Sequence, residues 1–264
     1  MKLDPVTSTE AGASVAQNVS LPVTSSETLA RSGRLSDAAW ICGMLQAGDS
    51  FYPTGSYAHS FGLEGLVQAG VVRDRGTLRD FIFRSVVPAL RQSELPLATH
   101  AWNAFAAGDW LKIREICELS AALKSPREAR LASDNIGRQR AELVASLRDF
   151  PEAKVYLERA AAEGWPFSPS VSAALEGRSA GAPLLAVLSG LTYSNFSGVL
   201  SAAMKLLRLG QNAAQSLLTE ALAEAPVMID AAVLVPFDEI GWFNPWLDIA
   251  AARHEIADGR MFIS

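Results

Sequence analysis

Residues 125–147 read SPREARLASDNIGRQRAELVASL and carry the clearest helix signal in the chain. Ser125, Pro126 and Glu128 fit the N-cap, first and third positions of a capping box. In such a box the serine oxygen accepts from the third amide, and the glutamate reaches back to the cap amide. No proline follows before Leu147, so the pattern predicts one long helix that ends near that residue.

Similar signals predict helices before this stretch. Leu78, Phe81, Ile82 and Val86 share one face of an amphipathic helix, which we expect Thr77 to cap. The other expected starts are Ser36 or Asp37, about Ala58, Ser93 and Asp109. The helix from about Ala58 is expected to stop at Gly70, and Pro88 is expected to kink the helix that contains it.

Helical patterns also continue toward the end of the chain, near 151–163, 183–208, 212–224 and 245–257. The run 233–237 is strand-like, but it is short and contains Pro236, so a loop is the better interpretation. Helices joined by short links predict an all-α fold. We expect a single domain of about nine or ten helices over residues 35–264.

Residues 1–34 differ from the rest of the chain. They are rich in Ser, Thr, Ala and Val and contain no aromatic residue. Such a segment buries too little apolar surface to offset its chain entropy, so we predict a disordered tail.

Composition limits the classes of function. The 264 residues carry a net charge of −5, which disfavours a nucleic-acid-binding protein because phosphate recognition needs a basic surface. The start of the chain has no apolar signal region, and no uncharged apolar run reaches the roughly 20 residues of a membrane span. These features predict a soluble, cytoplasmic protein, in which Cys42 and Cys117 are buried free thiols.

The most specific stretch is residues 44–64, MLQAGDSFYPTGSYAHSFGLE. It combines a helix end, a Pro-x-Gly turn and a dense group of aromatic and polar side chains. Pro53 fixes one dihedral of the turn, and Gly55 permits a positive φ or a close backbone approach. Tyr57 adds a large ring with a polar tip, which suits a protein interface as well as the edge of a core.

This stretch resembles the signature of the UreF family of urease accessory proteins, in which Leu-Gln precedes Pro-x-Gly and then His-Ser-x-Gly-Leu-Glu. Residues 124–138, 193–211 and 247–264 resemble three further family segments in the same order. The chain departs from the family at Ile263, where an arginine is usual, and around residues 165–175.

The resemblance implies an all-α scaffold that is not an enzyme and has no cofactor. It implies a homodimer in complex that binds a UreD/UreH-like accessory protein and recruits a UreG-like nickel GTPase to apo-urease. GTP hydrolysis by that partner would drive nickel insertion. The absence of a G-x-x-x-x-G-K-[S/T] phosphate loop from this sequence agrees with GTP chemistry in a partner.

The resemblance also selects candidate interface residues. Tyr57 and Tyr193 match aromatic positions involved in partner contact and dimer formation, and Arg260 and Phe262 match a C-terminal tail that orders when the UreD-like partner binds. Core packing is the alternative for each. The full set is Pro53, Gly55, Tyr57, His59, Ser60, Glu64, Tyr193, Arg253, His254, Arg260 and Phe262.

Two other classes of function remain as alternatives. Residues 58–62 have the form A-x-S-x-G, a variant of the hydrolase nucleophile elbow, but that motif needs a strand before Ser60. A serine hydrolase is therefore the weaker interpretation, and a helical adaptor with another client is the third. His59, His100 and His254 have no second His or Cys at helical ligand spacing, so no metal site is expected.

Overall fold

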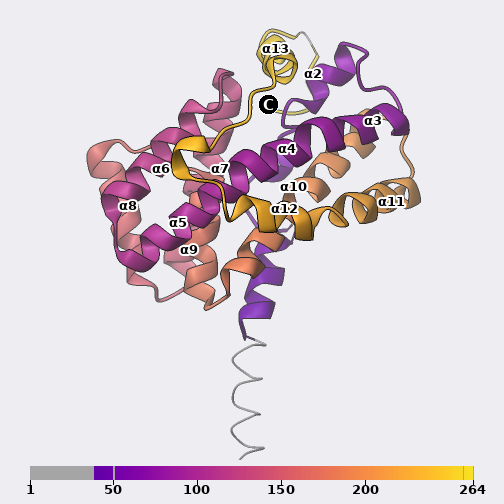
Figure 1. Cartoon of the computed structure of the whole chain (residues 1–264). Helices are drawn as coiled ribbons and strands as arrows, with labels where there is room; N and C mark the ends of the chain where they lie inside the picture. Colours follow the sequence, from indigo (N-terminus) through magenta and orange to yellow (C-terminus); the bar gives the residue numbers. More distant parts are fainter. Residues whose placement is uncertain (1–38, 50, 258, 264) are drawn as a thin grey trace, which may run out of the picture. The chain divides into compact units, whose positions relative to one another are not determined.

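Helices make up almost all of the regular structure in residues 39–49, 51–257 and 259–263, the residues that the computed structural model describes (Figure 1). No β-strand occurs in these ranges, which confirms the predicted all-α fold of about ten helices. The predicted tail over 1–34 and the predicted cap at Ser36 or Asp37 lie outside the described residues.

One helix, α9 (Pro169–Ala180), is buried on nearly every side, since residues 170–177 are all buried. It packs most extensively against α7 (Arg127–Leu147) and α5 (Leu95–Ala107). Gly137 of α7 makes this contact close, because a Cβ added there would lie 2.7 Å from the backbone of Ser168. A helix buried all round has no amphipathic stripe, so the sequence patterns did not predict α9.

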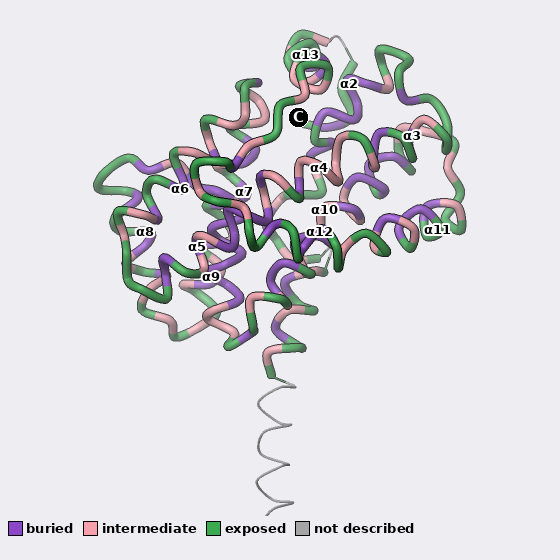
Figure 2. The backbone as a smooth tube through the Cα atoms, viewed as in Figure 1, coloured by how far each residue is buried: buried purple, intermediate pink, exposed green. Residues whose placement is uncertain are grey.

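Two apolar clusters flank this centre. The first joins α2 (Leu63–Gln68), α3 (Arg75–Phe81), α10 (Leu184–Leu206), α11 (Gln211–Leu222) and α12 (Ala225–Ala232). The second joins α5, α6 (Trp110–Ala122), α7, α8 (Pro151–Glu163) and α9, and is rich in aromatic rings. Buried residues concentrate where these helices face one another (Figure 2).

A continuous helical path runs over residues 75–107, through α3, α4 (Val87–Ala89) and α5. Two π-helical turns, Ile82–Val86 and Leu90–Glu94, interrupt it. Each π turn precedes a proline, Pro88 or Pro96, whose missing N–H breaks the regular hydrogen-bond ladder. The predicted helix start at Ser93 is wrong, because Ser93 is buried inside the second π turn.

Some of the predicted helix caps are confirmed and others are wrong. Asp109 caps α6 as expected and accepts from the Lys112 amide at 3.0 Å. Thr77 is not the cap of α3; Asp74 is, and Thr77 is the other member of its capping box. The box at residues 125–128 is also wrong. The long helix to Leu147 does form, but the described contacts of the Glu128 carboxylate are with His254 and Arg260 instead.

The predicted helix from Ala58 begins later than expected. A 3₁₀ turn, Ser56–Ala58, is followed by a bend with positive φ at Phe61 and Gly62, so α2 starts only at Leu63. The later predicted helices are observed as α8, α10, α11 and α13 (Pro245–His254), whereas α12 was not predicted. The run 233–237 is a turn leading into a 3₁₀ helix, Phe237–Glu239, as the loop interpretation expected.

Two further expectations concern burial. Cys117 is buried as predicted, but Cys42 is exposed, because the helix over residues 39–48 packs through the side that carries Gly43 and Ala47. Among the described residues, α10 alone is long and apolar enough to cross a membrane, which the sequence analysis did not anticipate. Its buried side packs in the first cluster, as expected of a core helix.

Substituting Gly137 tests the close approach of α7 and α9. Gly137→Ala should lower the free energy of unfolding by about 1–3 kcal/mol, because the new Cβ meets backbone that cannot give way. Gly198→Ala on α10 is the matched control, since its Cβ would meet only a Phe61 ring atom at 3.8 Å. The control should be neutral or stabilising by up to about 1 kcal/mol, from helix propensity alone. Urea unfolding of both variants measures the difference, and equal effects would contradict the packing account.

Candidate functional site

Glu64, the last residue of the signature stretch, is a buried carboxylate with three close partners. Its Oε1 accepts from the Met261 amide at 2.7 Å, and its Oε2 accepts from the Phe262 amide at 3.0 Å. The same Oε2 lies 2.9 Å from Nε2 of His254. Only 3% of the Glu64 surface is exposed. The side chain therefore ties α2 to the end of α13 and to the C-terminal segment.

Glu128, in the first turn of α7, is a second carboxylate at the same place. Its Oε2 lies 3.0 Å from Nδ1 of His254, and its Oε1 accepts from the Arg260 guanidinium at 2.7 Å. His254 is thus held between two carboxylates, and it is 1% exposed. Three segments that are far apart in sequence meet at this imidazole.

The C-terminal segment also bonds to the signature through its backbone. The Ile263 amide donates to the Ala58 carbonyl at 2.9 Å, and the Gln68 side chain donates to the Gly259 carbonyl at 2.9 Å. The Phe262 ring is 6% exposed and has the Lys205 ammonium 5.1 Å from its centroid. We call residues 58–68, Glu128 and residues 254–263, without the undescribed residue 258, the tail junction.

Glycines allow α2 and α13 to touch at the tail junction. Gly62 has φ 83°, and a Cβ there would lie 2.6 Å from a Leu247 methyl. A Cβ on Gly65 would lie 2.4 Å from the Ala250 carbonyl oxygen. The Phe-Gly-Leu-Glu-Gly sequence thus forms the bend and the tight helix contact that bring Glu64 to His254.

Electrostatics at the tail junction favour an ionised Glu64. Burial alone would raise its pKa, but the hydrogen bonds from the Met261 amide, His254 and the Phe262 amide outweigh burial and hold the pKa below the usual carboxyl value. Burial lowers the pKa of His59, against a smaller opposing effect of Glu128. The arrangement is therefore an ionic and hydrogen-bonded link rather than a set of apolar contacts.

The geometry around Ser60 is not that of a nucleophile elbow. Ser60 is fully buried, and its Oγ accepts from the Glu64 amide at 3.3 Å. A 3₁₀ turn, not a strand, precedes it, and the described residues contain no strand at all. The Ser60 hydroxyl here bonds to the first turn of α2, whose N-cap residue is Gly62.

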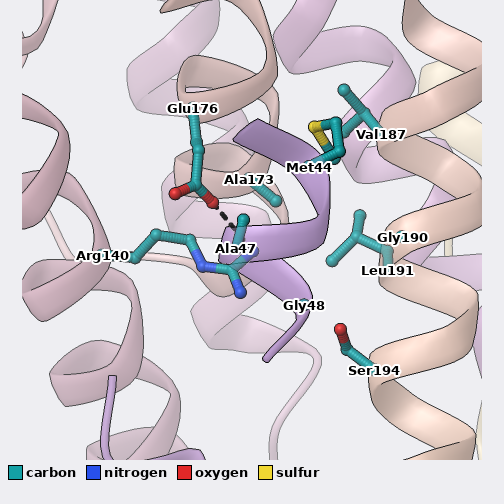
Figure 3. Close-up of a pocket in the computed structure, with 10 residues that line it drawn as sticks. All are labelled: Met44, Ala47, Gly48, Arg140, Ala173, Glu176, Val187, Gly190, Leu191 and Ser194. Atoms are coloured by element: carbon teal, nitrogen blue, oxygen red, sulfur yellow. Dashed lines mark ion pairs between the residues drawn. The ribbon is translucent and has the colours of Figure 1, made fainter. Parts of the chain in front are cut away.

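A second buried carboxylate supports the other end of the signature stretch. Glu176 of α9 accepts a short hydrogen bond from the Tyr52 hydroxyl and lies 3.7 Å from the Arg140 guanidinium. Burial, and then the charge of Glu176, raise the pKa of Tyr52 above its usual range. Figure 3 shows Arg140 and Glu176 facing each other beside Ala47, at a small pocket between α7, α9, α10 and the helix over residues 39–48.

The structure brings together part of the predicted set. Those at the tail junction are His59, Ser60, Glu64, His254, Arg260 and Phe262. Pro53 and Arg253 are exposed, Gly55 is half-buried, Tyr57 is 69% exposed, and Tyr193 is 44% exposed on α10. Sequence reasoning missed Glu128 and Glu176 as site residues, because no local pattern reports a partner more than 100 residues away.

The described residues hold no group of His, Cys, Asp or Glu side chains placed to bind a metal ion. At the tail junction the carboxylate oxygens and both ring nitrogens of His254 are already engaged with one another or with N–H donors. Its chemistry is that of a structural link.

The chain is similar to known proteins both within its helical core and in segments outside that core. The family model for UreF matches residues 72–222, more than half of the chain. A urease accessory protein UreF from Methylibium petroleiphilum is 30% identical over 230 residues, which are 86% of this chain and 95% of that protein. The chain belongs to the UreF family. The urease accessory protein UreF of an Azoarcus species is 31% identical over 84% of this chain and 94% of its own length.

The match to the UreF family begins after α2 and ends with α11, so it leaves out most of the tail junction. Of that junction it includes only Glu128. The similarity to the Methylibium protein over 86% of the chain shows that the likeness to UreF relatives also covers segments outside residues 72–222.

The ionised Glu64 predicts a pH dependence of stability. Because its pKa is lowered in the folded chain, its contribution is present above the ordinary value of 4.5 and is lost as pH falls through the folded value. Glu64→Gln should lower the free energy of unfolding at pH 7 by about 3 kcal/mol, since it leaves buried donors and charge without their partner. The deficit should shrink as pH falls below 4.5.

Chemical unfolding between pH 3 and pH 7 measures this deficit. Glu115→Gln, an exposed carboxylate paired with Lys112 on α6, is the control and should leave the curve nearly unchanged. A Glu64→Gln deficit that is constant across this range would contradict the assignment of an ionised Glu64.

Proposed function

We propose that this chain is a urease maturation factor that acts as a scaffold and not as an enzyme. In this proposal it binds a UreD/UreH-like accessory protein in the cytoplasm and presents a UreG-like nickel GTPase to apo-urease. Nickel is cargo for the assembly, and no nickel ligand is assigned to this chain. Membership of the UreF family is the observation that carries the proposal.

The tail junction supports a role for the signature and the C-terminus as one unit. Three segments that resemble the family, residues 44–64, 124–138 and 247–264, supply Glu64, Glu128 and His254 to it. A surface composed of all three would be rigid when the C-terminal segment is docked. A partner that recognises this surface would therefore sense whether the segment is in place.

Exposed aromatic side chains lie on or next to the elements that form the junction. Tyr57 is 69% exposed, Phe243 is 74% exposed and Trp246 is 77% exposed. Ile249, three residues after Trp246 on α13, is also exposed, and so is Ile256, which follows the end of that helix. Large exposed aromatic residues are typical anchors of protein interfaces, so we assign this surface to the UreD/UreH-like partner.

We assign the homodimer contact to α10. Tyr193 is half exposed near the middle of this helix, and Leu185 and Met204 are exposed on the same helix. A helix this apolar with exposed Leu, Tyr and Met side chains is suited to packing against a second copy. Because α10 also packs against α2, this contact would lie beside the tail junction of each copy.

Co-expression with the cognate UreD/UreH-like and UreG-like proteins tests the proposal. The wild-type chain should purify with both, with two copies of each protein by mass determination. The double variant Tyr57→Ala/Trp246→Ala should weaken binding of the UreD/UreH-like protein by at least about tenfold, because hot-spot aromatics contribute about 2 kcal/mol or more each.

Leu111→Ala on α6 is the matched control, since Leu111 is 74% exposed and lies on an element outside the junction. It should bind as the wild type does. A folded wild-type chain that binds neither partner would overturn the proposed function. Equal binding by the double variant and the wild type would overturn the assignment of the surface.

A further inference from the structure

Residues 51–58, here called the signature loop, have little regular structure of their own. The Thr54 amide donates to the Tyr52 carbonyl at 2.8 Å, which closes a local turn. The 3₁₀ turn that follows, Ser56–Ala58, contains no buried residue. Local bonds of this kind shape a loop, but they do not determine where it lies on the helices beneath it. Contacts with those helices must do so.

Tyr52 makes such a contact. Its hydroxyl donates a hydrogen bond to Oε1 of Glu176 on α9, 124 residues away. Tyr52 is half-buried, and burial, followed by the charge of Glu176, holds its pKa above the usual range, so the hydroxyl remains a donor at neutral pH. In the part of the chain that the structure describes, no other side chain of the signature loop bonds to a helix outside the loop.

Glu176 is a fixed acceptor for this bond. It is 2% exposed and lies in the fully buried stretch 170–177 of α9. Its other oxygen, Oε2, is 3.7 Å from the guanidinium of Arg140 on α7, whose side chain is 13% exposed (Figure 3). The carboxylate is thus held by a buried helix and a nearby cation. The Tyr52 hydroxyl therefore ties the signature loop to the most buried helix of the fold.

A second contact places the part of the loop that carries Tyr57. Gly55 has φ 77° and lies against α7, where an added Cβ would be 3.2 Å from Oε1 of Gln139. Pro53, between this contact and Tyr52, has one restricted backbone dihedral. Tyr57 follows in the 3₁₀ turn and is 69% exposed. A shift at Tyr52 therefore reaches Tyr57 through a short, stiff segment.

We propose that Tyr52 is a positioning residue for the UreD/UreH-like partner: its hydrogen bond to Glu176 holds the signature loop so that Tyr57 stands in its binding position before the partner arrives. This inference rests on the proposed function, in which Tyr57 is an anchor of the partner surface. A loop that is already held in its bound arrangement loses less conformational freedom on binding, so it binds more tightly than a loose loop.

The size of the effect follows from the population of the correct loop arrangement. The apparent dissociation constant equals the intrinsic constant divided by the fraction of chains whose loop is competent to bind. A hydrogen bond to a carboxylate is stronger than one between neutral groups, so it keeps most loops in place. Its loss should leave roughly 10–30% of the loops competent, and Tyr52→Phe should then weaken binding by about three- to tenfold.

Hydrogen exchange of the free, full-length chain tests the anchor itself. Tyr52→Phe keeps the ring and removes only the hydroxyl. Amide exchange in the peptide that contains residues 51–58 should become severalfold faster at pH 7, and by a larger factor than in peptides from α9. Tyr57→Phe is the matched control, since it removes another hydroxyl of the same loop, one with no hydrogen bond among the described residues, and should exchange as the wild type does. Equal exchange in Tyr52→Phe and the wild type would overturn the proposal.

A binding cycle with Tyr57 separates positioning from a general loss of structure. Affinity for the UreD/UreH-like protein is measured for the wild type, Tyr52→Phe, Tyr57→Ala and the double variant. If Tyr52 acts through Tyr57, Tyr52→Phe should weaken wild-type binding by about three- to tenfold but weaken Tyr57→Ala by less than about twofold. The same factor in both backgrounds would overturn this inference alone. A folded wild-type chain that does not bind the partner would overturn the proposed function and this inference with it.

Discussion

The buried Glu64 carboxylate requires hydrogen-bond donors, and this requirement joins α2 to the C-terminal segment. Glu64 finds its partners at His254, Met261 and Phe262, between 190 and 198 residues away. A carboxylate buried without such partners costs several kcal/mol, so the bend at Gly62 and the docking of the last residues are conditions for burying Glu64. The rest of the tail junction, with Glu128 and Arg260, is built around the same imidazole.

The sequence predicted most of the helices because their patterns are local. The long helix after residue 125 and the Asp109 cap depend on neighbours within a few residues. Buried α9 shows where such reasoning stops, since a helix covered on all sides has no periodic apolar stripe to detect. Glu128 shows a second limit: its spacing suited a capping box, yet a histidine 126 residues away took the carboxylate.

Residue type alone did not separate interface from core. Tyr57 and Phe262 were both candidates for partner contact, and the structure places the first on the surface and the second in the apolar core. The signature can be recognised from sequence because its glycines and Ser60 have fixed local roles in the bend before α2. Which helices the signature stretch contacts depends on long-range packing, and no short motif encodes that packing.

A double-mutant cycle between Glu64→Gln and His254→Gln tests this account most directly. Urea unfolding at pH 7 of the wild type, both single variants and the double variant gives the coupling free energy. If the two side chains stabilise the fold through their shared contact, the coupling should be about 1–3 kcal/mol. Additive effects, equal within about 0.5 kcal/mol, would contradict the claim that this contact joins the signature to the C-terminal segment.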